Sequence, residues 1–319
     1  MLSDMLASTT QRLTKLENQA RGGIIGGVRI LAGLLWLANI HWKVPTAFGE
    51  DTKGGLYKYS ASVLRHSPFA PFRWVTEHII LPNFQLFGWI TLLSEIAFAA
   101  LLLIGYRTKL VALGGALMSV PIMLSVIYYD KGDEWSWSYL LMIGLHLLLI
   151  ASDGGGHLGL DGLLRRDRSA AANGLKTFGV IATIVGLLGL FVARSVDFAG
   201  SQAALLGSDA GFVGDGDKIV RRWELKFLWF NPLWALLTIV CGVLLVLGAR
   251  KAQLALAGAG GFAVIALVAL FTKTFDYVRD DGVVQPVATG SNVAFWAGLA
   301  IAGGLLARRS MTTSAAATA

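Results

Sequence analysis

The sequence predicts an all-α polytopic membrane protein with about eight transmembrane helices, arranged as two related four-helix bundles. Three observations support this fold class. Hydrophobic residues make up 55% of the 319 residues and charged residues only 15%, whereas an ordinary soluble domain has ~25% charged residues. The mean hydropathy is +0.62. The apolar residues gather in segments of roughly 20, the length of helix that crosses a bilayer core, which excludes a soluble enzyme or a disulfide scaffold.

The elements follow in order along the chain. Residues 1–22 carry several charges and predict a cytoplasmic amphipathic helix, with Leu2, Met5, Leu6, Leu13 and Leu16 on one face. The apolar segments expected to span the membrane are 23–42, 84–105, 109–128, 137–153, 177–196, 229–248, 253–273 and 290–308. Residues 309–319 are expected to form a cytoplasmic tail.

An internal repeat divides the spans into two units, 23–165 and 177–308. Aligning Gly105-Tyr106-Arg107 on Gly248-Ala249-Arg250 superposes two helix ends and their short basic links. The second unit is then a degenerate copy, because Thr238 falls on Glu95 and Ala300 falls on His146. A functional site is therefore expected in the first unit.

The charges predict how the chain sits in the membrane. The short links Arg107–Lys109 and Arg250–Lys251 are basic, and basic links favour the cytoplasmic side. We therefore expect a multi-pass protein of a bacterial or archaeal inner membrane, with both termini cytoplasmic. The formal net charge of +7 fits such links, and membrane lipids rather than nucleic acid are the expected contacts.

Three ionisable residues fall inside the spans of the first unit, where a charge is costly and often functional. These residues are Arg29, Glu95 and His146. Counted along their spans, they lie at similar depths, so an ion pair between Arg29 and Glu95 is expected. Glu95 and His146 are the candidates for proton transfer at a quinone headgroup. The alternatives are that these residues only fix how the helices pack, or that they line an ion or proton pathway.

Metal and covalent cofactors are not expected. His41 and His146 are too far apart in depth to hold one haem iron, and no spacing matches a zinc site. The chain has one cysteine, Cys241, and no flavin fingerprint. Electrons would therefore come from a partner subunit, and quinone is the one ligand expected.

The first half resembles the DoxX/DoxD-like family, named for the small membrane subunit of thiosulfate:quinone oxidoreductase. The resemblance covers roughly residues 22–165. It rests on VRILAGL from Val28 to Leu34, on Lys43, on Glu95, on the hairpin LLLIGYRTKLVALGG, and on the glycine-rich SDGGGHLGLDGLL, which contains Asp153 and Asp161.

The resemblance implies a four-helix membrane unit associated with redox enzymes, with Lys43, Asp153 and Asp161 as family-motif residues. Together these observations predict a membrane subunit of a redox complex that passes electrons from a partner subunit to the quinone pool. Two alternatives stay open: a non-catalytic anchor or assembly subunit, and a transporter of protons or small solutes.

Overall fold

The chain is a multi-pass membrane protein built almost entirely of helices. The computed structural model describes residues 2–126, 136–200, 202–205, 209–211, 222–224, 228–278 and 284–316. Within these residues, six helical segments are long and apolar enough to cross a membrane, and two apolar helices are shorter. The six segments and the two short helices correspond to the eight predicted spans.

The eight helices form two rings of four. The first ring contains α1 (Leu2–Ile40), α4 (Phe84–Ile104), α5 (Thr108–Val126) and α6 (Ser136–Ala151). The second ring contains α8 (Arg168–Val192), α9 (Pro232–Gly248), α10 (Ala252–Thr272) and α11 (Gly290–Ala316). In each ring consecutive helices pack together and the last helix packs on the first. This shared order is the one expected of two related bundles.

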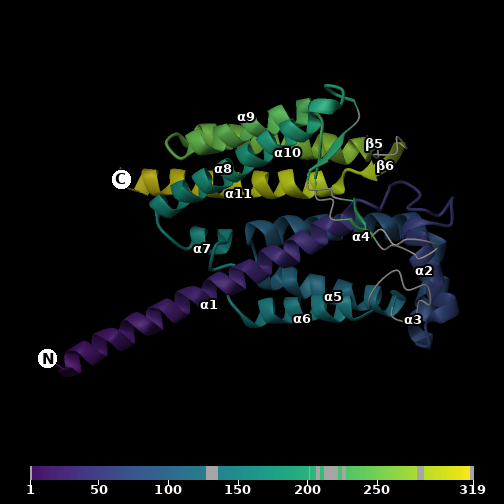
Figure 1. Ribbon diagram of the computed structural model, residues 1–319, viewed down its shortest axis with the longest axis horizontal. Coiled ribbons are helices and arrows are strands. Elements are labelled where there is room, and N and C mark those ends of the chain that lie inside the picture. Colours follow the sequence, from purple (N-terminus) through teal and green to yellow (C-terminus); the bar gives the residue numbers. More distant parts are fainter. Residues whose placement is uncertain are drawn as a thin grey trace.

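The two rings meet along α4 and α11, which lie side by side in the middle of the molecule (Figure 1). A Cβ atom on Gly298 of α11 would lie 3.2 Å from Ile104 and 3.3 Å from the carbonyl oxygen of Ala100. A Cβ atom on Gly290 would lie 2.5 Å from Ile40. Glycines therefore let α11 approach the first ring closely.

Several predicted boundaries differ from those in the structure. The predicted amphipathic helix 1–22 is not separate, because α1 is one helix from Leu2 to Ile40, and its first half projects from the bundle (Figure 1). Helix α8 begins at Arg168 rather than at 177, since the carboxylate of Asp167 accepts the N–H of Ala170 and caps the helix there. Of the predicted tail, residues 309–316 continue α11 and 317–319 lie outside the described residues.

Shorter elements gather at one end of the molecule (Figure 1). Between α1 and α4 lie α2 (Gly55–His66), α3 (Ala70–Val75), a π-helix (Thr76–Ile80) and a 3-10 turn (Leu81–Asn83). Between α8 and α9 lie a 3-10 turn (Ala193–Ser195) and two antiparallel strand pairs, β1 (Ala203–Leu205) with β4 (Leu228–Phe230) and β2 (Asp209–Gly211) with β3 (Arg222–Glu224). Between α10 and α11, β5 (Thr274–Val278) pairs with β6 (Val284–Ala288). Both chain termini and α7 (Leu160–Leu164) lie at the other end.

Hydrogen bonds fix both the end of α4 and the start of α5 at the short link between them. Gly105 has φ +70°, and the N–H groups of Gly105 and Tyr106 donate to the carbonyls of Leu102 and Leu101, which closes α4 with a Schellman motif. The next helix begins at once, because the carboxylate of Asp161 accepts the N–H groups of Arg107 and Thr108. Asp161 is thus the N-terminal cap of a helix more than fifty residues away in sequence.

Candidate functional site

The buried arginine, lysine, glutamate and histidine side chains of the described residues all lie in the first half. They are Arg29, Lys43, Glu95 and His146, each 0–2% exposed. In the second half, the buried polar side chains of the described part are uncharged: Gln202, Asn231, Thr238, Thr289, Ser291, Asn292 and Ser310. The first half is therefore where the structure places groups that can move a proton.

The predicted ion pair between Arg29 and Glu95 is wrong. Arg29 Nη1 donates to the carbonyl oxygens of Leu102 and Leu103, and Nη2 donates to the carbonyl of Leu158 at 2.7 Å. The carbonyls at the C-terminal end of α4 carry the negative end of the helix dipole. These carbonyls accept from both Nη atoms, and no carboxylate contacts them among the described residues, so Arg29 joins the end of α4 to the glycine-rich segment.

The error came from counting depth along separate spans. Arg29 lies against Gly105, where an added Cβ would be 2.8 Å from the guanidinium carbon. Glu95 is ten residues earlier on α4, which is about 15 Å along the helix. Helix α1 begins well before residue 23, the first residue of the predicted span. Counting from residue 23 therefore gave the wrong depth for Arg29.

Glu95 pairs instead with Lys43. Lys43 Nζ lies 2.9 Å from Glu95 Oε2, and both side chains are buried. The amide Nδ2 of Asn39 donates to Glu95 Oε1 at 3.2 Å. Lys43 also donates to the carbonyl of Asn39 at 2.6 Å and lies 3.9 Å from the centre of the Trp42 ring. The chain turns back just after α1, with the N–H of Lys43 on the carbonyl of Ile40, which brings the ammonium over α4.

The Lys43–Glu95 pair forms part of the wall of a cavity of about 90 Å³. Helices α1, α4 and α5 form one side, and α2, α3 and the π-helix cover the other. Several aromatic side chains line the cavity with the pair: Trp42, Tyr59, Phe72, Phe87 and Tyr139. Since one water needs ~10–15 Å³ of such space, the cavity has room for several waters or a single small ring.

His146 lies outside that cavity and has partners of its own. The indole N–H of Trp36 donates to His146 Nε2 at 3.0 Å, and His146 Nδ1 lies 2.7 Å from the carbonyl of Met142. An indole nitrogen can only donate and a carbonyl can only accept, so Nδ1 carries the hydrogen and the ring is neutral. Gly115 makes room for the ring, because an added Cβ would lie 2.2 Å from Nε2.

The two aspartates of the predicted family motif have structural contacts. Asp161 caps α5, as described above. Asp153 lies 3.2 Å from Arg165 in an exposed ion pair. The glycines between them pack tightly, since an added Cβ on Gly155 would meet the Asp161 carboxylate at 2.2 Å. Among the motif residues, only Lys43 reaches the buried carboxylate.

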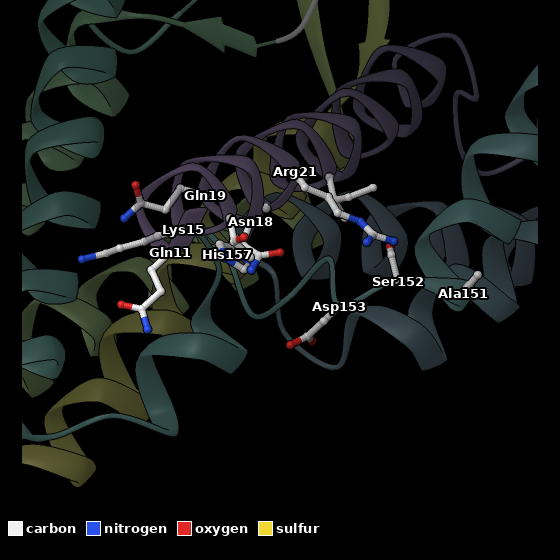
Figure 2. A pocket seen from close by; sticks show the side chains of 12 residues that line it. Gln11, Lys15, Asn18, Gln19, Arg21, Ala151, Ser152, Asp153 and His157 are labelled. Carbon is white, nitrogen blue, oxygen red and sulfur yellow. The ribbon is translucent and has the colours of Figure 1, made fainter. Parts of the chain in front are cut away.

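A second hollow lies at the end of the molecule that carries the termini. It is an open groove of about 1060 Å³. Figure 2 shows its lining from two sides: Gln11, Lys15, Asn18, Gln19 and Arg21 on the projecting part of α1, and Ser152, Asp153 and His157 on the segment after α6. This groove is wide and open, so it fits a protein surface better than a small ligand.

The counterpart of Glu95 in the second half is an uncharged residue. Thr238 is fully buried, donates to the carbonyl of Trp234 at 2.7 Å, and accepts the indole N–H of Trp296 at 3.0 Å. These contacts satisfy the hydroxyl. The second half therefore lacks the charged pair at the position that the repeat assigns to Glu95.

Residues 58–188 match the protein family described as TQO small subunit DoxD. The chain carries a DoxD-like segment. The match runs from α2 into α8, so the DoxD-like segment includes Glu95, His146, Asp153 and Asp161, whereas Arg29 and Lys43 precede it. The resemblance to the DoxX/DoxD-like family is thus confirmed, over a window that lies later than 22–165. No curated protein and no solved structure matches the chain.

Sequence reasoning missed three features of the site. It did not pair Lys43 with Glu95, although Asn39 and Lys43 are four residues apart at the end of the first span. It also missed the bond from Trp36 to His146. Finally, it overlooked Thr91, which lies one helical turn before Glu95 and lines the same cavity. Asn39 and Lys43 are four residues apart, and so are Thr91 and Glu95; this spacing was the available signal.

Proposed function

We propose that this chain is a membrane subunit of a quinone-linked redox complex and that the Lys43–Glu95 pair faces the quinone headgroup. The observation that carries the proposal is this fully buried pair at the wall of an aromatic-lined cavity. Burying two charges costs several kcal/mol per ion before their attraction is counted. An ionisable residue at this depth is accordingly a functional-site hypothesis by default.

The match to TQO small subunit DoxD supports the redox assignment. In this proposal a partner subunit exchanges electrons with the quinone pool, while this chain holds the ring and handles the protons. Reduction of a quinone takes up two electrons, which the partner supplies, and two protons. The Lys43 ammonium can donate a hydrogen bond to a ring oxygen and stabilise the negative charge that develops there, and Glu95, protonated in turn for each transfer, can pass the two protons to the ring.

The residues around the pair fit a flat ring. Trp42 and Tyr59 come from the segment after α1 and from α2, while Phe87 comes from α4. Such aromatic side chains pack well against another ring. The proposed orientation, with both termini cytoplasmic, places the cavity toward the outer side of the inner membrane, because α2 and α3, which line it, lie at the end of the molecule opposite the termini (Figure 1).

The test is a Glu95→Gln variant in the assembled complex. The amide keeps the shape of the side chain and can still hydrogen-bond to Lys43, so the complex should accumulate. Turnover with quinone per assembled complex should fall by about 10²-fold or more, the low end for loss of a proton-transfer group. Asp153→Asn makes the same chemical change at an exposed carboxylate and should leave turnover unchanged.

The same assay separates this function from its alternative. A non-catalytic anchoring subunit is favoured by the projecting half of α1 and the groove in Figure 2, which offer a partner a docking surface. In that case Glu95→Gln would change only the amount of complex, and turnover per complex would stay normal. His146→Ala, measured alongside, tests the proton-transfer role predicted for His146.

A further inference from the structure

The part of α1 that projects from the bundle is an exposed helix (Figure 1). Helix α1 runs without a break from Leu2 to Ile40, and its exposed charged residues end at Arg21. At 1.5 Å per residue, residues 2–22 extend about 30 Å beyond the apolar part of the helix. Gln11, Arg12 and residues 14–21 are all exposed. A helix of this length is marginal in water unless another surface covers its apolar face.

A heptad pattern runs along this projecting part. Its core positions recur at alternating spacings of four and three residues and are occupied by Leu2, Leu6, Thr9, Leu13, Leu16 and Ala20. All but the threonine are apolar, and an average spacing of 3.5 residues is the pattern of a coiled coil. Leu16 is 61% exposed. The six positions are called the heptad stripe below.

The groove of Figure 2 lies on the opposite face of the same helix. Its lining includes Gln11, Lys15 and Asn18, which occupy outer positions of the heptad pattern. Gly22 continues this opposite face, since a Cβ added there would lie 2.2 Å from the ring of His157. The heptad stripe therefore faces away from the chain's own bundle, and a partner on the stripe would leave the groove open.

The heptad stripe continues into the apolar part of α1 as small residues. Gly23 and Gly27 lie one heptad after Leu16 and Ala20, and both glycines are exposed. No described atom other than neighbouring backbone lies within 4 Å of a Cβ added at either glycine, so packing within the chain does not account for them. Two glycines four residues apart let two membrane helices approach each other closely.

The membrane surface does not fit as the cover of the heptad stripe. An amphipathic helix that binds the surface lies in the plane of the interface, so the chain must turn where it leaves the membrane. Helix α1 makes no such turn (Figure 1). Two copies of this chain, inserted in the same orientation, would instead project their α1 helices on the same side and in parallel.

The charges beside the stripe fit a second copy of the chain. Arg12 and Glu17 occupy the two positions that flank the core of a coiled coil. They are five residues apart, so they do not face each other on one helix. In a parallel coiled coil, however, the first of these positions faces the second position of the next heptad on the other helix. Arg12 of each copy then meets Glu17 of the other copy, twice by symmetry.

We infer that the chain pairs with a second copy of itself through a parallel coiled coil of residues 2–22, with Leu16 against Leu16 and Arg12 beside Glu17 across the pair. The coil is short, so the pair forms in the membrane, which holds both chains in one orientation and at high effective concentration. Gly23 and Gly27 let the two helices stay close where they enter the bilayer. This inference is independent of the proposed function, because the Lys43–Glu95 pair takes no part in it.

The experiment is oxidative cross-linking of the full-length chain in native membranes. Leu16→Cys and Asn18→Cys are compared in a Cys241→Ala background, so that each variant carries a single cysteine. Both sites are exposed and only two residues apart, so random collisions would cross-link them equally. Leu16→Cys should give a disulfide-linked dimer in several-fold higher yield than Asn18→Cys, because position 16 lies at the interface and position 18 on the outer face.

Reversing the flanking charges tests the parallel register. In the Leu16→Cys protein, Arg12→Glu places glutamates opposite each other at both symmetric contacts. The protein-to-lipid ratio at which half of the chains cross-link in vesicles should then rise by about 10-fold. Adding Glu17→Arg exchanges the two charges and should restore the original ratio. Lys15→Glu is the matched control, since it makes the same charge change at an exposed outer position and should leave the ratio unchanged.

Two outcomes would overturn the inference. Equal yields for Leu16→Cys and Asn18→Cys would show that the chains meet only by collision. A dimer that Arg12→Glu weakens no more than Lys15→Glu does, or that Glu17→Arg does not rescue, would show that the two helices are not paired in this parallel register. Turnover with quinone is not the readout in either case, so the proposed function stands or fails separately.

Discussion

At the residue scale, the structure assigns the two buried cations to different tasks. Arg29 binds only backbone carbonyls in the described structure, and its planar group suits three acceptors that converge from a helix end and a loop. Lys43 is a point charge on a flexible stem, and it contacts the one buried carboxylate of the described bundle. Arg29 therefore stabilises the link between two segments, while Lys43 and Glu95 are the pair available to a ligand.

Lys43→Met should be more destabilising than Glu95→Gln. The methionine leaves a fully buried carboxylate without its counter-charge, and removing one member of a buried pair costs about 3–5 kcal/mol. The glutamine leaves Lys43 with the carbonyl of Asn39 and the ring of Trp42, so its cost should be smaller. Thermal unfolding of the purified variants in detergent checks this order.

The double variant Lys43→Met with Glu95→Gln should recover much of the stability lost by Lys43→Met, because neither of the two positions then holds a buried charge. Lys109→Met removes an exposed lysine and should leave the midpoint unchanged. Equal midpoints for Lys43→Met and Lys109→Met would show that the buried pair contributes nothing to stability.

At the element scale, distant or adjacent carboxylates decide where helices begin. Asp161 caps α5 from the far side of α6, and Asp167 caps α8 from the position just before it. A helix N-terminus leaves several N–H groups without partners inside the helix. A carboxylate there satisfies them and also favours the positive end of the helix dipole.

The cap of α8 should depend on pH. The N–H of Ala170 and the hydroxyl of Ser169 donate to the Asp167 carboxylate and lower its pKa below the usual value near 3.8. A carboxylate whose pKa is lowered in the folded state stabilises the fold above its unfolded pKa, and this stabilisation is lost as pH falls through the lowered value. The first turn of α8 should therefore be protected from hydrogen exchange at pH 6 and lose protection only below about pH 4.

Hydrogen exchange of the segment around Ala170, corrected for intrinsic rates, measures this effect. Asp167→Asn is the control, since asparagine also caps helices but does not ionise. Its protection should not change over the same range. Loss of protection at the same pH in both proteins would assign the effect to general acid unfolding instead of the cap.

At the scale of the whole molecule, the two rings bury different kinds of side chain and share one interface, the seam between α4 and α11. The first ring holds the buried charges, and the second ring has satisfied uncharged groups such as Thr238 at the corresponding place. Helix α11 of the second ring packs against α4, which carries Glu95 and Thr91. The second ring thus supports the helix that forms the polar wall of the cavity.

Gly298→Leu should weaken the seam. Its Cβ alone would press against Ile104 and the carbonyl of Ala100, and overpacking of this kind typically costs about 1–3 kcal/mol. Gly304→Leu is the matched control on the same helix, because nothing lies within 4 Å of a Cβ added there. Thermal midpoints in detergent should fall for the first variant only. The same midpoint in both would mean that α4 and α11 do not pack closely in the membrane.

The sequence by itself determined the class of protein, the approximate position of each span, and the half of the chain that carries intramembrane charge. These features depend on local composition. A run of apolar residues must cross the bilayer as a helix, and any charged residue within that run can be read directly from the sequence. The short basic links and the family resemblance were visible in the same way.

The tertiary structure alone decided which groups meet. The choice of Lys43 over Arg29 as the partner of Glu95 depends on the turn after α1 and on depth along two packed helices, and an error of a few residues moves a side chain by a full turn. The carbonyls that accept from Arg29 and the helix N-terminus that Asp161 caps are backbone groups that sequence patterns do not identify. That the Thr91 hydroxyl has no hydrogen-bond partner among the described residues can be established only from the positions of the neighbouring atoms.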